Sequence, residues 1–95
     1  MASYECMFIL RPDLTEEAVE AAITRVLCLG GELGGTVENV DRWGKRRLAY
    51  EINDFREGNY TVVKFHSEPG TTTELERNLK LTPEVIRYMV VKLGS

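Results

Sequence analysis

Three consecutive cations follow a glycine near the middle of the chain. A glycine such as Gly44 lets the backbone bend, and the residues directly after it, here called the basic finger, are Lys45, Arg46 and Arg47. Apolar or aromatic residues then alternate with others, which puts them on one face of a strand: Leu48, Tyr50 and Ile52. The pattern predicts a rigid cationic projection held against a sheet, suited to contacts with phosphate groups. An ordinary hairpin with a solvated run of charge explains the spacing equally well.

The basic finger belongs to an otherwise acidic chain. The sequence has 15 acidic and 12 basic residues and a net charge of -3, so overall charge does not favour non-specific binding to a polyanion. Arg42 lies just before the finger, so a third of the cations fall within six residues. Such clustering on an acidic body predicts a defined docking site rather than a general coat for polyanions.

Length and composition predict one small globular domain over residues 1–95, with 43% apolar residues. The apolar runs are too short for a membrane-spanning helix, and the start lacks the pattern of a signal peptide. Without an export signal, Cys6 and Cys28 are expected to be reduced core residues rather than a disulfide. No motif indicates a cofactor, a metal or a small-molecule substrate.

The periodicity of apolar residues positions the basic finger within six elements. Strands are predicted over residues 4–10, 36–52, 60–66 and 85–93, with a bulge at Gly44 and a turn over residues 53–58. One helix is expected to start after Thr15 as its N-cap and to end at Gly30-Gly31, and a second helix is expected over residues 72–81. The order is strand–helix–strand–strand–helix–strand, which predicts an α+β, ferredoxin-like sandwich. Its four-stranded antiparallel sheet has the first and third strands in the centre and both helices on one face.

The sheet face without helices is expected to be unusually apolar. Strand alternation places six apolar or aromatic residues there, as candidates for binding a partner protein: Met7, Ile9, Tyr60, Val62, Met89 and Val91. Together they predict a contiguous contact surface. Scattered apolar residues on a protein surface are the alternative explanation.

The motif over residues 43–53, together with the element order, resembles the bacterial small-subunit ribosomal protein S6 family along the whole chain. Tyr4-Glu5 opens the first strand as in that family, Arg11-Pro12 closes it, and residues 53–58 and 85–92 are similar to its hairpin and final strand. The run of cations followed by Leu48-Ala49-Tyr50 is the specific part, because similarity of fold alone does not supply it.

The resemblance implies a structural protein of the cytoplasmic ribosome, without catalysis, that supports subunit assembly and translation. It implies binding to the central domain of the 16S rRNA beside ribosomal protein S18, with which the family forms a heterodimer. The RNA-contacting cations of the family carry over to Lys45, Arg46, Arg47, Arg87 and Lys92. Arg42 joins them through the charge cluster. Tyr50 is a candidate for stacking on a base, although its alternating strand position, like that of Trp43, is more typical of a core residue.

Three other classes of protein are alternatives to this family. A stand-alone RNA-recognition domain shares the topology but requires aromatic side chains in a glycine-rich context, which residues 58–65 lack. An enzyme is disfavoured because His66, the one histidine, lies in a predicted strand, where a surface role is more typical than a catalytic one. Another ferredoxin-like protein-interaction module remains an alternative.

Overall fold

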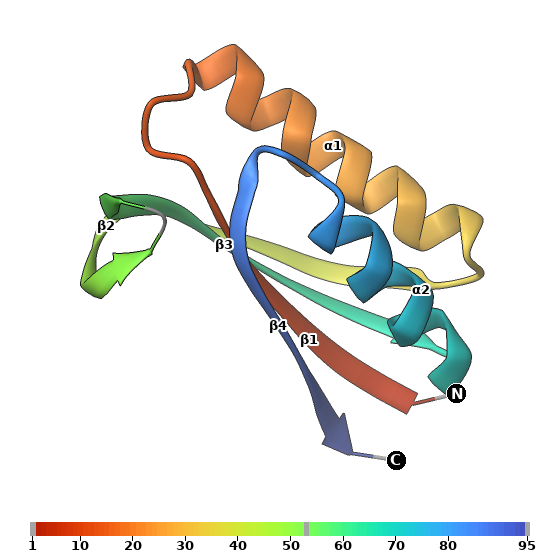
Figure 1. Ribbon diagram of the computed structural model, residues 1–95. Coiled ribbons are helices and arrows are strands. Elements are labelled where there is room, and N and C mark those ends of the chain that lie inside the picture. The colour runs from red at the N-terminus through yellow and green to blue at the C-terminus, as the bar shows by residue number, and fades with distance from the viewer. Residues whose placement is uncertain (1, 53, 95) are drawn as a thin grey trace.

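Four strands form one antiparallel sheet, and both helices pack on the same face of it (Figure 1). The computed structural model describes residues 2–52 and 54–94. Its elements are β1 (Ala2–Leu10), α1 (Glu16–Glu32), β2 (Thr36–Ile52), β3 (Phe55–Ser67), α2 (Pro69–Lys80) and β4 (Val85–Gly94). The strands lie in the order β2-β3-β1-β4. This arrangement confirms the predicted ferredoxin-like α+β fold, with β1 and β3 in the centre.

Helix α1 forms because its start is capped and one of its faces is apolar. The Thr15 hydroxyl accepts a hydrogen bond from the Ala18 N–H at 3.1 Å, as the sequence predicted. Glu16 and Glu17 follow in the first turn, where the helix dipole favours anions. The residues that α1 buries recur at helical spacing: Val19, Ala22, Ile23 and Val26.

The predicted end of α1 at Gly30-Gly31 is wrong, because the helix continues to Glu32. The chain turns instead at Gly34, whose φ of +90° lies in the region that favours glycine. The Gly35 N–H then donates to the Gly30 carbonyl at 2.8 Å. A Cβ at Gly35 would lie only 2.9 Å from that carbonyl oxygen, so the close approach itself requires a glycine.

Three element starts also differ from their predicted positions, and the first is β1, which begins at Ala2 rather than at residue 4. Helix α2 begins at Pro69, which occupies the first helical turn where its missing N–H costs nothing, rather than at residue 72. Strand β3 begins at Phe55 rather than at residue 60, because Ile52 already lies opposite Phe55. Of the predicted turn over 53–58, Asn53 lies outside the described residues and Asp54 has a φ of 68°.

The core lies between the helices and the sheet face that they cover. Phe8, Leu10 and Leu79 are its largest fully buried apolar side chains. Cys6 is buried beside them, and burial, aided by the charge of Glu76, raises the pKa of its thiol to about 12. Cys28 is also a free thiol, but it is exposed on α1, so the expectation that both cysteines are core residues is wrong for Cys28.

Candidate RNA-contact and partner-docking surfaces

The bend at Gly44 separates the basic finger from the rest of β2. Gly44 has a φ of +79°, and the pairing of β2 with β3 shifts register between Arg42 and Gly44, which confirms the predicted bulge. Beyond it, Lys45, Arg46 and Arg47 are all exposed. No ion pair joins these three side chains to an acid within residues 2–52 and 54–94, although Arg47 lies opposite Glu57 in the register. The finger therefore presents uncompensated positive charge to solvent.

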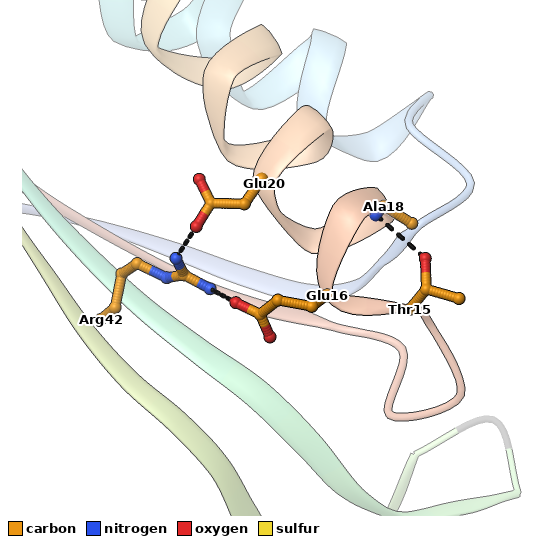
Figure 2. A network of polar contacts seen from close by, with 5 residues as sticks. All are labelled: Thr15, Glu16, Ala18, Glu20 and Arg42. Carbon is orange, nitrogen blue, oxygen red and sulfur yellow. Dashed lines mark hydrogen bonds and ion pairs between the residues drawn. The ribbon is translucent and has the colours of Figure 1, made fainter.

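Arg42 is separated from the basic finger because its side chain is bound to helix α1 (Figure 2). Its guanidinium donates one hydrogen bond to Glu16 at 2.9 Å and another to Glu20, one helical turn further along. The hydrogen bond to Glu16 is the main reason that the pKa of Arg42 is raised above its ordinary value. The structure thus places Arg42 on the helix-covered side of β2, where two carboxylates offset its charge.

Trp43 is enclosed by an aromatic ring and a cation. Its ring stacks on Tyr60, with 6.0 Å between the ring centroids and 9° between the ring planes. The Arg46 guanidinium lies 5.9 Å from the Trp43 ring centroid, and its Nε donates to the Trp43 carbonyl at 3.3 Å. The indole N–H donates to Asp41 at 3.0 Å. Trp43 remains 44% exposed, so it is not the core residue that its position in the strand favoured.

Tyr50 lies in the open at the end of the hairpin formed by β2 and β3. It is 60% exposed, so the core position favoured by strand alternation is wrong. Its hydroxyl oxygen accepts a hydrogen bond from the Arg87 guanidinium, whose carbon lies 5.8 Å from the ring centroid. Residues 50 and 87, which are distant in the sequence, are therefore brought together.

Lys92 is exposed too, but it lies opposite Tyr4, a core residue, and so shares the helix-covered side.

The predicted six-residue apolar patch divides into a covered part and an exposed part. We call the sheet face without a described helix the open face. On it, Ile9 is only 3% exposed and Val62 only 8%, so the expectation that these two contribute to an exposed patch is wrong. Met7 and Tyr60 are half-buried. The end of the hairpin explains the burial of Ile9, because Leu48, Tyr50 and Ile52 line one hollow with Met7 and Ile9.

The exposed part of the open face follows the edge strand β4. Met89 and Val91 are each 44% exposed, as predicted, and Leu93, which the sequence reading did not include, is 47% exposed. These three exposed residues are here called the β4 strip. Met89 and Val91 alternate along the strand and so share the open face, whereas Leu93 lies at a register shift of β4 against β1.

Sequence reasoning did not identify the hydroxyl and the carboxylate that lie beside the one histidine, His66. His66 contacts Ser3 at 2.9 Å and Glu38 at 2.8 Å, a hydrogen-bonding role within the sheet. Across the described residues, no group of three or more metal-binding side chains comes together. Within residues 2–52 and 54–94, no helix is long and apolar enough to cross a membrane.

The class of protein is defined first by its fold, which combines the strand order, the placement of both helices and the open face. The fold is shared with the C-terminal domain of the MgtC protein from Mycobacterium tuberculosis, at 14% identity and a TM-score of 0.65, which shows likeness of fold alone. It is shared far more closely with 30S ribosomal protein S6 from Thermotoga maritima. That chain is 39% identical with a TM-score of 0.92, and the match covers 96% of this chain and 86% of the other.

Sequence comparison then identifies the family. The family profile described as ribosomal protein S6 matches residues 3–92. Small ribosomal subunit protein bS6 of Clostridium novyi is 50% identical over 91 residues, which are 96% of each chain. The bS6 protein of Moorella thermoacetica is 45% identical over 93 residues, 98% of this chain and 95% of the relative. The chain belongs to the ribosomal protein S6 family, whose members are structural components of the ribosome and not enzymes.

Proposed function

We propose that this protein binds the central domain of the 16S rRNA as a heterodimer with ribosomal protein S18, within the small ribosomal subunit of the bacterial cytoplasm. Membership of the ribosomal protein S6 family supports the ribosomal role. The observation that carries the RNA contact is the basic finger, three exposed cations beyond the Gly44 bulge without a salt-bridge partner among the described residues. Phosphate contacts of this kind fix position on a folded RNA without reading its sequence.

The two surfaces contribute different chemistry to this role. The basic finger and Arg87 supply cations on the hairpin and on β4, whereas the β4 strip supplies apolar area on the open face. Exposed apolar side chains along an edge strand favour a polypeptide partner, since the surface of a folded RNA presents mainly charged and polar groups. We assign the cations to the RNA and the β4 strip to ribosomal protein S18. Arg42 and Lys92 are weaker candidates, because both lie on the helix-covered side.

The stand-alone RNA-recognition alternative finds little support in the open face. Such domains stack bases on aromatic side chains of the central strands. Here the central strand β1 contributes Met7 and Ile9, and β3 contributes one aromatic ring, Tyr60, which Trp43 already covers. The described structure therefore favours RNA binding at the hairpin rather than across the sheet.

The test is to measure RNA binding with and without the partner. The net charge of -3 opposes a polyanion, and three or four cations supply few phosphate contacts. We expect weak binding of central-domain RNA by the purified protein and tight binding once ribosomal protein S18 is added, in titrations at fixed salt. Tight, specific binding by the protein alone, or no binding by the mixture, would contradict the proposal.

A further inference from the structure

The end of the hairpin holds an aromatic ring in a fixed and accessible position. Tyr50 is the most exposed aromatic residue among the large hydrophobic side chains on the surface, at 60%. Its hydroxyl is bound by Arg87 from β4, so the ring is anchored to a neighbouring strand at its polar end. Below it lies a hollow of about 190 Å³, whose floor includes Met7, Ile9 and Leu48. The hydrogen bond limits the rotamers of the ring, and Tyr50 remains 60% exposed although the Arg87 guanidinium lies over the ring.

Trp43 provides a direct contrast on the same hairpin. It also pairs with an arginine, but Tyr60 stacks against it at 6.0 Å and the Arg46 guanidinium lies 5.9 Å from its centroid. Tyr60 therefore already stacks on the indole. Around Tyr50, the one aromatic or cationic contact recorded among the described residues is the one with Arg87. The hairpin therefore has one aromatic ring that is stacked and one that is available for stacking.

The charge around Tyr50 suits a nucleic acid. A second shallow hollow shares Leu48, Ala49 and Tyr50 with the first and is also lined by Arg47 and by the ion pair of Arg56 with Glu51, 3.1 Å apart. Arg47 is therefore the cation of this hollow that has no acidic partner among the described residues. The Arg87 guanidinium lies over the Tyr50 ring, 5.8 Å from its centroid. Cations beside a stacking ring match a nucleotide, whose planar base is attached to charged phosphates. The hollow is also smaller than the roughly 300–1,000 Å³ of small-molecule sites, which favours an open stacking surface over an enclosed pocket.

We propose that Tyr50, held in place by Arg87, is a stacking platform for one unpaired base of the bound RNA. This inference rests on the proposed function, which supplies the RNA, and it adds a base contact to a surface that otherwise contacts phosphate. Tyr50 touches the base, and Arg87 acts as the positioning residue through the tyrosine hydroxyl. A side chain of the partner protein is the competing occupant of the platform.

The test uses Tyr50→Leu and Tyr50→Phe in the full chain, together with ribosomal protein S18 and central-domain RNA. Removing the ring in Tyr50→Leu is expected to weaken RNA binding by about 5- to 150-fold, the equivalent of about 1–3 kcal/mol for one stacked base. The slope of log affinity against log salt should not change, because no phosphate contact is lost. Tyr50→Phe keeps the ring but loses the hydrogen bond from Arg87, so its affinity should lie between that of the unaltered protein and that of Tyr50→Leu. The control Trp43→Phe preserves an aromatic partner for Tyr60 and should also bind normally.

An abasic scan of the RNA identifies the base directly. One abasic position should weaken binding of the unaltered protein as much as Tyr50→Leu does, and should have no further effect on that variant. The proposal is overturned if Tyr50→Leu binds RNA within twofold of the unaltered protein, or if it loses ribosomal protein S18 instead of RNA. Failure of the unaltered mixture to bind RNA would reject the proposed function itself, a result distinct from a failure of Tyr50 alone.

Discussion

The two edge strands of the sheet, β2 and β4, differ in charge, in regularity and in the side chains that they expose. Strand β2 carries the basic finger and shifts register against β3 at three places along its length. Strand β4 pairs with β1 without a shift from Lys92 to Arg87 and exposes Met89, Val91 and Leu93. Bulges and charges discourage the pairing of an edge with another strand, whereas a regular apolar edge is open to it. The difference supports the proposal that β2 contacts RNA and that β4 contacts a polypeptide.

Ion pairs nevertheless join helix α1 to both edges, and the element that supplies the cation differs between the two. On the β2 side, the strand supplies the cation, Arg42, and the helix supplies Glu16 and Glu20. On the β4 side, the helix supplies the cation, Arg25, and Glu84, directly before the strand, supplies the anion at 2.7 Å. Helix α1 thus contacts both edges of the sheet that carries the basic finger and the β4 strip.

The largest expected effect distinguishes buried from exposed residues within the open face. Ile9→Asp should lower the free energy of unfolding by about 3 kcal/mol or more, because it places an unpaired charge where a 3%-exposed apolar side chain lay. This loss is similar to the decrease in the free energy of unfolding of about 3–5 kcal/mol that is expected for Phe8→Ala in the main core. Urea unfolding measures both. The matched control is Val91→Asp, at a 44%-exposed position on the same face, which should cost about 0.5 kcal/mol or less. Equal costs for Ile9→Asp and Val91→Asp would contradict the division of this face.

A smaller effect separates Arg42 from the basic finger. Arg42→Ala should lower the free energy of unfolding by about 0.5–1 kcal/mol, because it removes two partly exposed ion pairs. It should leave the salt dependence of RNA binding unchanged, whereas Lys45→Ala should reduce the log–log slope by about 0.7–0.9. Titrations at several salt concentrations measure both variants. A slope reduced as much by Arg42→Ala as by Lys45→Ala would place Arg42 in the RNA interface.

The smallest effect concerns the ion pair on the β4 side. The hydrogen bond from Arg25 holds the pKa of Glu84 below its ordinary value of 4.5. Since the folded state has the lower pKa, the stabilisation is present above the ordinary value and is lost as the pH falls through the lowered one. Glu84→Gln should therefore cost about 0.2–1 kcal/mol at pH 7, and the difference should vanish in acid. Arg25→Gln is the matched control, with the same loss at pH 7. A cost that persists in acid would mean that packing, not charge, explains it.

Local patterns allowed much of the fold to be predicted from the sequence. Strand β2 has the predicted bounds, Thr36–Ile52, and the bulge falls at Gly44, because alternation and a glycine are both local signals. The burial of Ile9 could not be predicted in this way, since it depends on the end of the hairpin folding against β1. Gly58 illustrates the same limit. It was assigned to a turn, but a Cβ there would lie 2.2 Å from Ile9 Cγ2, so its role is tertiary packing.

The candidate site was only partly accessible from the sequence for a related reason. Spacing alone grouped Arg42 with the basic finger, but successive strand residues point to opposite faces, and the bulge begins only after Arg42. Its carboxylate partners, Glu16 and Glu20, are four residues apart on a predicted helix, which was a usable signal. The contact between Tyr50 and Arg87 gave no such signal, because it joins strands through an irregular stretch of β2 after Arg47.

Assaying two variants against two binding partners tests most directly whether β2 contacts RNA and β4 contacts the partner protein. The variant Lys45→Ala/Arg46→Ala/Arg47→Ala and the variant Met89→Asp/Val91→Asp are each assayed for binding to ribosomal protein S18 and, with that partner present, to central-domain RNA. The account predicts that the first variant still binds the partner and loses about 2–3 from the log–log salt slope of RNA binding. The second variant should fold normally and lose the partner. The account is contradicted if the finger variant loses the partner while the β4 variant retains it, or if the salt slope is the same with and without the finger.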